Sequence, residues 1–129
     1  MAHASLALTL LQGMYAICRM GPDGGIPAWA LQGDFSSITR TPDEMSVVVS
    51  QERVPEGMPR DSGWRCFRVE GPLPLSTIGV LAALTVPLSK ASVSLFAVST
   101  YDTDYLLVKG HALERTAEAL AQAGHTVKM

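Results

Sequence analysis

The stretch LSTIGVLAALTVPLSKASVSLFAVSTYDTDYLLV, residues 75–108, holds a helix, a turn and two strands in an order that decides the fold. From Leu75 to Leu88 the large apolar residues recur every three or four positions, which is typical of one face of a helix. Ser76 is the expected N-cap of this helix. Pro87 is expected to kink or loosen its last turn.

The segments on both sides complete a recognisable order. SVSLFAVST (92–100) is apolar on both faces, like a central strand, and DYLLVK (104–109) is its expected hairpin partner. GWRCFRVEG (63–71) predicts a strand before the helix. HALERTAEALAQAG (111–124) predicts a second helix that stops at its glycine, and HTVKM (125–129) a short last strand. The order is β-α-β-β-α-β, so we predict an α+β, ferredoxin-like antiparallel sheet with two helices on one face.

The first half is rich in strands. Residues 6–11 and 14–20 are expected to form one hairpin, and residues 34–41 and 45–51 a second. AWAL (28–31) predicts at most one helical turn. These segments supply too little helix to cover both faces of their own sheet, so we expect the first half to lean on the second.

A polar, Pro- and Gly-rich linker at residues 54–63 marks the expected boundary between the halves. It divides the chain into an N-terminal module, residues 1–61, and a C-terminal module, residues 62–129.

Composition excludes several classes of protein. The chain has 129 residues and a net charge of −2, with no run of Lys and Arg, so a nucleic-acid-binding surface is not expected. No segment approaches the ~18 apolar residues of a membrane span. The apolar start lacks a basic region before it, so we expect a cytoplasmic protein rather than an exported one. Cys18 and Cys66 lie in strand-like runs, and we expect free thiols.

No motif for catalysis, metal or cofactor binding stands out. Neither a nucleophile elbow nor a phosphate-binding glycine loop is found, and no histidine pair has metal-ligand spacing. His3, His111 and His125 are expected to be solvated residues at a chain end or at helix ends. Asp102 and Asp104 would serve as an acid–base pair only in an apolar pocket that separates their pKa values.

Two corners of the second half have complementary charge. Thr77, Ile78, Gly79 and Val80 open the predicted helix, where free N–H groups and the helix dipole favour an anion. Gly79 costs about 1 kcal/mol of helix propensity relative to Ala, which close approach of a ligand or tight packing would explain. In the turn STYDTDY (99–105) a backbone-capping role suits Asp102. Asp104 is then available to bind a cation. An α-amino acid would suit both corners, with its carboxylate at the helix N–H groups and its ammonium at Asp104.

The quoted motifs resemble those of ACT domains, which are small amino-acid-binding regulatory modules. FRVEGPLPLSTIGVLAAL and VSLFAVSTYDTDYLLV carry the resemblance, which covers Trp64 to Val127. The branch that looks most similar consists of small bacterial two-module ACT proteins related to the cytosolic arginine sensors of animals. DFSSITRTPDEMSVVVSQERVPEG (34–57) is similar to the degenerate N-terminal ACT-like module of that branch.

The resemblance implies a non-enzymatic amino-acid sensor with the ligand at a module interface. Separately, we expect a homodimer, because small ferredoxin-like sheets leave edges and faces exposed and the sequence has few charges. Matched position by position, its ligand-binding residues are Thr77, Ile78, Gly79, Val80, Thr100, Tyr101 and Asp104. Asp104 matches the residue that meets the ligand's cation, and Tyr101 matches an aromatic that stacks on the ligand. Thr77 departs from an acidic residue, which weakens the case for arginine itself. The alternatives are a small enzyme or enzyme subunit that uses Asp102 or Asp104, or a purely structural interaction module.

Overall fold

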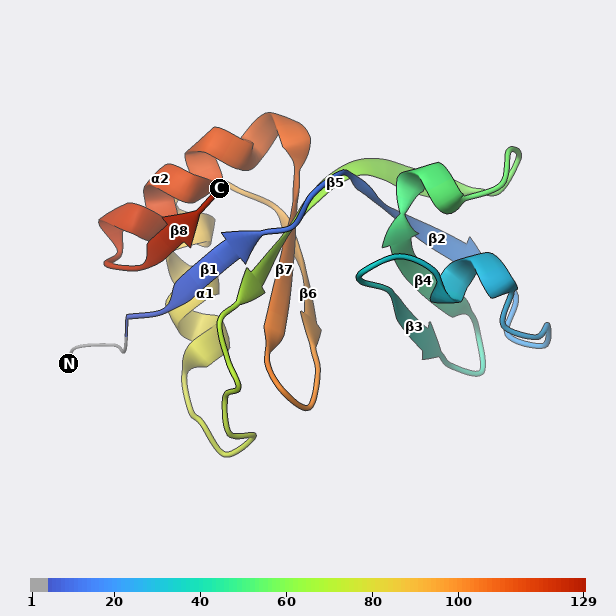
Figure 1. Ribbon diagram of the computed structural model, residues 1–129, viewed down its shortest axis with the longest axis horizontal. Helices are drawn as coiled ribbons and strands as arrows, with labels where there is room; N and C mark the ends of the chain where they lie inside the picture. Colours follow the sequence, from blue (N-terminus) through green and yellow to red (C-terminus); the bar gives the residue numbers. More distant parts are fainter. Residues whose placement is uncertain (1–4) are drawn as a thin grey trace. The chain divides into compact units, whose positions relative to one another are not determined.

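The computed structural model describes residues 5–129, which form two compact units (Figure 1). We call residues 5–12 and 65–129 the helical unit, and Gly13–Trp64 the strand unit. Strand β5 (Arg60–Val69) contributes its first part to the strand unit and the rest to the helical unit. The predicted boundary at residue 61 lies close to this division. Residues 5–12, however, belong with the C-terminal unit, so the two modules are not consecutive in sequence.

The helical unit has the predicted β-α-β-β-α-β order, which confirms the ferredoxin-like fold. After β5 come α1 (Val80–Lys90), β6 (Leu95–Ser99), β7 (Asp104–Lys109), the 3-10 turn η3 (Gly110–Ala112), α2 (Leu113–Gln122) and β8 (Thr126–Lys128). An additional strand, β1 (Ala7–Leu10), precedes them. Neighbouring strands are hydrogen-bonded in the order β6-β7-β5-β1-β8.

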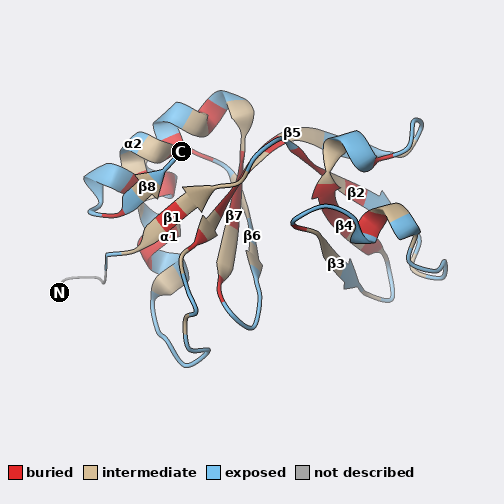
Figure 2. Cartoon of the chain, in the orientation of Figure 1, coloured by how far each residue is buried: buried red, intermediate tan, exposed pale blue. Residues whose placement is uncertain are grey.

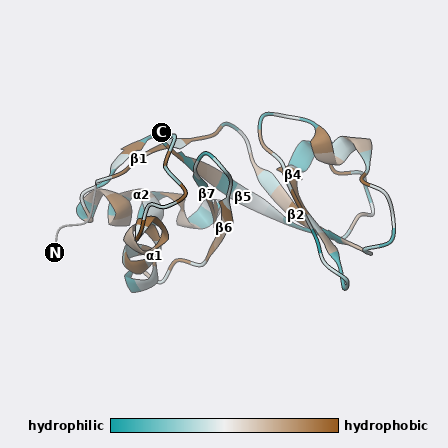
Figure 3. Ribbon diagram, turned by 90° about the horizontal axis from the view of Figure 1, so that it is seen from below, coloured by the Kyte–Doolittle hydropathy of each residue, from teal (hydrophilic) through white to brown (hydrophobic). Residues whose placement is uncertain are grey.

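The core of the helical unit lies between the sheet and the two helices. Leu84 and Leu88 of α1 and Leu120 of α2 are fully buried, and they pack with alternate residues of the strands, such as Phe67 and Val69 of β5. Figure 2 shows buried positions on both the strands and the helices of this unit. This alternation places one set of strand side chains on the helix-covered face. Helix α1 is apolar along most of its length (Figure 3). Two of its apolar residues, Leu81 and Val86, are exposed.

The predicted hairpin between residues 6–11 and 14–20 is wrong. Strand β1 is antiparallel to β5, with Leu8 opposite Val69, and parallel to β8, with Leu8 opposite Val127. Strand β2 (Tyr15–Met20) pairs with another part of β5, in the strand unit. Because β5 is ten residues long, β1 and β2 each find a partner on it, and this long-range pairing replaces the local hairpin.

Two further expectations are corrected within the helical unit. Strand β6 is not central, because in the described part of the chain it pairs with β7 alone and so lies at the sheet edge. The helix begins at Val80, and its N-cap is Gly79 rather than Ser76. Pro87 lies inside the helix, which continues to Lys90.

The strand unit contains the second predicted hairpin, formed by β3 (Ser37–Arg40) and β4 (Met45–Ser50). Its strands follow the order β3-β4-β2-β5. AWAL forms a single 3-10 turn, η1 (Ala28–Leu31), as predicted, and η2 (Gln51–Arg53) follows β4. The core consists of small and medium apolar residues: Ala16, Cys18, Ala30, Met45, Val47, Val49 and Val54.

Both cysteines are buried free thiols, which confirms the prediction. Burial raises the pKa of Cys66 to about 12, so its thiol stays protonated near neutral pH. Burial also raises the pKa of Cys18, although Arg60 opposes this effect. Within residues 5–129, no helix is long and apolar enough to cross a bilayer.

Candidate functional site

A pocket of about 270 Å³ opens at the start of α1 in the helical unit. One wall is the β5–α1 loop with the first turn of α1, and the other is the turn that joins β6 to β7. The two predicted corners therefore line the same pocket. The lining residues are Leu73, Pro74, Leu75, Thr77, Gly79, Val80, Leu81, Ser99, Thr100, Thr103 and Asp104.

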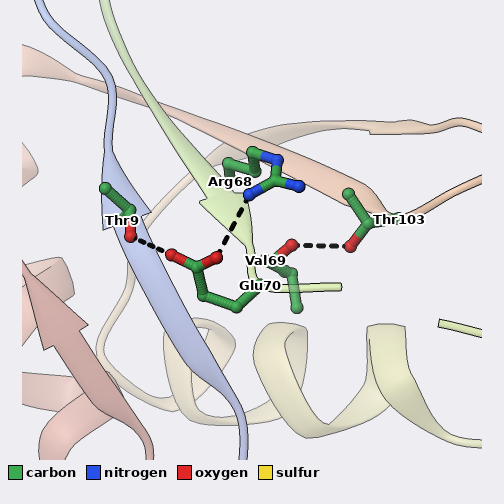
Figure 4. A network of polar contacts seen from close by, with 5 residues as sticks. All are labelled: Thr9, Arg68, Val69, Glu70 and Thr103. Atoms are coloured by element: carbon green, nitrogen blue, oxygen red, sulfur yellow. Dashed lines mark hydrogen bonds and ion pairs between the residues drawn. The ribbon is translucent and has the colours of Figure 1, made fainter. Parts of the chain in front are cut away.

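The β6–β7 turn is fixed against β5 and the loop that follows it. The Thr103 hydroxyl, which is almost fully buried, donates to the Val69 carbonyl at 2.7 Å (Figure 4). The Leu73 N–H donates to the Asp102 carbonyl at 2.7 Å. Gly71 permits this approach, because a Cβ there would lie 3.1 Å from the Thr103 Cβ. These contacts hold the turn wall of the pocket in place.

Thr100 caps the turn itself. Its hydroxyl donates to the Thr103 carbonyl at 2.9 Å and accepts from the Thr103 N–H at 3.3 Å. The capping role that the sequence suggested for Asp102 is therefore wrong. Asp102 is exposed and contributes its backbone carbonyl, while its side chain lies beside a neighbouring surface hollow of about 440 Å³.

Asp104 brings a negative charge to the pocket. It is the first residue of β7, opposite Ser99, and is half-buried. Among residues 5–129 it has no ion-pair partner, and no Lys or Arg lines the pocket. A carboxylate that shares a pocket with hydroxyls and apolar groups, without a protein cation, is complementary to a cationic ligand group.

The helix wall supplies backbone donors. Val80, Leu81 and Ala82 are the first three residues of α1, so their N–H groups have no acceptor within the helix. Together with the helix dipole they favour an anion. The Thr77 N–H is not available, because it donates to the Pro74 carbonyl at 2.9 Å.

Gly79 is explained by backbone conformation. Its φ of 86° and ψ of 5° lie in the left-handed region, which disfavours residues with a Cβ. A Cβ at this position would meet nothing within 4 Å. Neither tight packing nor close ligand approach, the two reasons considered from the sequence, is therefore needed to account for this glycine.

The structure brings together five of the seven predicted site residues: Thr77, Gly79, Val80, Thr100 and Asp104. Ile78 and Tyr101 are not among the lining residues, and they are 96% and 81% exposed. Sequence reasoning missed Thr103 and Ser99, although the quoted turn contains both. No local signal distinguished Thr103, because the hydrogen bond that anchors it is made to Val69, far away in the chain.

A second polar group, outside the pocket, consists of Thr9 on β1, Arg68 on β5 and Glu70, which directly follows β5. The Thr9 hydroxyl donates to the Glu70 carboxylate, and Arg68 Nη1 lies 3.1 Å from its other oxygen (Figure 4). The Thr9 hydrogen bond, together with the nearby charges of Arg68 and Lys128, lowers the pKa of Glu70. In the part of the chain that the structure describes, no three His, Cys, Asp or Glu side chains are grouped to hold a metal ion.

Comparison with known proteins identifies both units. Residues 60–122 match the ACT domain family, and residues 13–57 match a second family that describes an N-terminal domain. A protein from Agrobacterium tumefaciens is 42% identical, with 97% of this chain and 93% of that chain covered and a TM-score of 0.91.

More distant structures share the fold. A Vibrio cholerae protein described as a possible transport protein is 18% identical, covering 92% of this chain and 90% of that chain, with a TM-score of 0.75. The ligand-free regulatory subunit of aspartate kinase from Thermus thermophilus is 16% identical, covering 94% and 99%, with a TM-score of 0.66.

Proposed function

Because the chain contains an ACT domain and belongs to the same family as the Agrobacterium protein, we propose that it is a non-enzymatic regulatory module that binds an amino acid. ACT domains are in general regulatory modules that bind small molecules, amino acids above all. The proposed binding site is the pocket at the start of α1.

One observation carries this proposal: the pocket has a negative and a positive wall, and no ion pair among residues 5–129 neutralises the negative one. Asp104 lines one side without an ion pair among the described residues, and the first-turn N–H groups of α1 lie on the other. An α-amino acid has an ammonium and a carboxylate on neighbouring atoms. The pocket volume of about 270 Å³ is just below the ~300–1,000 Å³ of drug-sized ligand sites, as suits a smaller ligand.

We expect a polar or basic side chain on this amino acid rather than a large apolar one. If the ligand's α-ammonium or a guanidinium meets Asp104, the charge-assisted bond contributes roughly 1.5–3 kcal/mol. The resemblance to the arginine-sensing branch supports a basic ligand, while Thr77, at the position where an acid is expected, favours a ligand other than arginine.

We also propose that the protein is a cytoplasmic homodimer. Large apolar side chains beside the pocket are exposed, namely Leu75 at 71%, Ile78 at 96% and Tyr101 at 81%. Such a group on a small protein is typical of an interaction surface. The open edge of β6 is a second place where a copy of the chain could pair. Two buried thiols agree with a reducing compartment.

A thermal-shift screen against the twenty amino acids tests the proposed function, and calorimetry on each hit gives the affinity. A ligand present at 100 times its Kd should stabilise the folded state by about 2.7 kcal/mol and raise Tm by several degrees. If no amino acid raises Tm, the module is not an amino-acid sensor. Analytical sedimentation at micromolar concentrations tests the dimer separately, and a purely monomeric profile would contradict it.

A further inference from the structure

Helix α1 contains a proline at a position where its backbone needs a donor. In a helix the N–H of residue i+4 donates to the carbonyl of residue i. Pro87 has no N–H, so the Ala83 carbonyl lacks its helical partner. Because α1 runs on to Lys90 without a break, another donor is expected at Ala83.

That donor is His125. Its Nε2 lies 2.9 Å from the Ala83 carbonyl oxygen, and the side chain is only 6% exposed. Its Nδ1 accepts the Leu6 N–H at 3.0 Å. Because Nδ1 is an acceptor, the ring is neutral with its proton on Nε2, and both nitrogens are satisfied. The expectation that His125 is a solvated helix-end residue is therefore wrong, whereas His111 is exposed as predicted.

The same ring joins α1 to the N-terminal strand. Leu6 directly precedes β1, and its carbonyl accepts the Thr126 N–H at 2.8 Å. Both the N–H and the carbonyl of Leu6 are therefore hydrogen-bonded. Ala83 is one turn from the pocket, and its N–H donates to the Gly79 carbonyl at 2.9 Å. A continuous chain of hydrogen bonds thus runs from Leu6 through His125 and Ala83 to Gly79.

We propose that His125 is a positioning residue, which replaces the hydrogen bond that Pro87 removes and fixes the first turn of α1 to strand β1. The N-terminal strand, which is remote in sequence from the pocket, thereby sets the placement of the pocket's helix wall. The importance of this wall for a ligand rests on the proposed function. The replacement by His125 of the hydrogen bond that Pro87 removes does not depend on the proposed function.

Three substitutions separate the two bonds of the ring. His125→Asn keeps an oxygen close to the Nδ1 position for Leu6 but has no donor that reaches Ala83. His125→Gln places an amide donor near the Nε2 position but loses the acceptor for Leu6. Pro87→Ala restores an N–H at residue 87, which can donate to the Ala83 carbonyl. Urea unfolding of the full chain, without ligand, measures each variant alone and combined with Pro87→Ala.

We expect His125→Asn to lower the folding equilibrium constant roughly ten- to hundredfold, because it leaves a buried carbonyl unsatisfied. With Pro87→Ala the same change should cost less than about threefold. His125→Gln should cost the same in both backgrounds, because Pro87→Ala gives nothing to Leu6. Equal cost of His125→Asn in both backgrounds would overturn the proposal. If His125→Asn does not fold, folding of the double variant is the expected rescue, and its failure to fold counts against the pairing.

Amide hydrogen exchange provides a readout of positioning. Without denaturant, His125→Asn should speed hydrogen exchange of the Ala83 amide and shift the NMR signals of Val80–Ala82. Adding Pro87→Ala to this variant should reverse both effects. A uniform change across all core amides would show general destabilisation instead and would refute the positioning role. These measurements use no ligand. A negative result here would therefore not contradict the proposed amino-acid binding. Equally, a negative amino-acid screen would not change the interpretation of these measurements.

Discussion

The two walls of the pocket are built in different ways. The turn wall is fixed by side-chain and backbone hydrogen bonds to β5 and its following loop, with Thr103 buried and Gly71 crowded. The helix wall depends on the left-handed backbone of Gly79, around which there is free space. The negative charge is therefore presented by a rigid element, while the anion-binding donors depend on a backbone conformation. Each wall can be tested by substitutions that leave the other intact.

The largest effect should come from the charge on the turn wall. Asp104→Asn removes the carboxylate but keeps the size of the side chain, so an amino-acid ligand should bind roughly ten- to hundredfold more weakly. Calorimetry with the best amino acid from the thermal-shift screen measures this loss.

Asp102→Asn is the matched control, because Asp102 is two residues away, exposed and outside the pocket lining. It should change the affinity little. If both variants bind like the parent protein, or if Asp102→Asn is the more damaging, the ligand does not meet Asp104 and the site is placed wrongly.

Rigidity of the turn wall should depend on one buried hydroxyl. Thr103→Val keeps the shape but leaves the Val69 carbonyl without this donor, and we expect a loss of about 1–3 kcal/mol in the free energy of unfolding. Thr116 offers the same substitution at a fully buried site, where the hydroxyl has no hydrogen-bond partner among the described residues. Thr116→Val should be neutral or stabilising. Similar losses for the two variants in urea unfolding would mean that the Thr103 bond is not what fixes the turn.

The helix wall should also be sensitive to the backbone conformation at Gly79. Gly79→Ala introduces a Cβ at a positive φ and should destabilise the protein by about 1–2 kcal/mol, although no atom crowds the site. Asn tolerates the left-handed region and is a good N-cap, so Gly79→Asn should cost clearly less. Chemical denaturation of both variants decides this. An equal cost for Ala and Asn would show that the backbone conformation is not the reason for the glycine.

Local patterns predicted most of the helical unit. The 3.6-residue periodicity of α1, the turn residues around Asp102 and the glycine after α2 were sufficient for element type and order. They failed where a distant partner decides the outcome. Strand β1 pairs with β5 and β8 rather than with its sequence neighbour β2, and no pattern within residues 6–20 contains that information.

The same limit applies to the candidate site. Charge and residue type identified Asp104 and the helix start, and both line the pocket. The roles of Thr100 and Thr103 in the turn could not be read from the sequence, because Asp, Ser and Thr can all cap a turn. His125 was predicted to be solvated because it lies at a helix end. This prediction failed because its two hydrogen-bond partners, Leu6 and Ala83, are far away in the chain.

The smallest effect should come from Glu70, whose charge lies next to the loop of the helix wall but outside the pocket. The Thr9 hydrogen bond, together with the charge of Arg68, lowers the pKa of Glu70 in the folded protein below its ordinary value of 4.5. A lowered folded-state pKa means that ionised Glu70 stabilises the fold at pH values above 4.5. This contribution is lost as the pH falls through the folded-state pKa.

Glu70→Gln should therefore lower the free energy of unfolding slightly at pH 7, and the difference from the parent should shrink as the pH falls through the folded-state pKa. The effect stays small because the side chains of Arg68 and Glu70 are 37% and 38% exposed, and solvent screens exposed ion pairs. Urea unfolding at pH 7 and at a series of acidic pH values follows this difference. In a Thr9→Val background the pH 7 difference should shrink, since that change removes the main cause of the lowered pKa. A difference that grows on acidification would contradict the sign of the shift and would mean that Glu70 stabilises the fold in its protonated form.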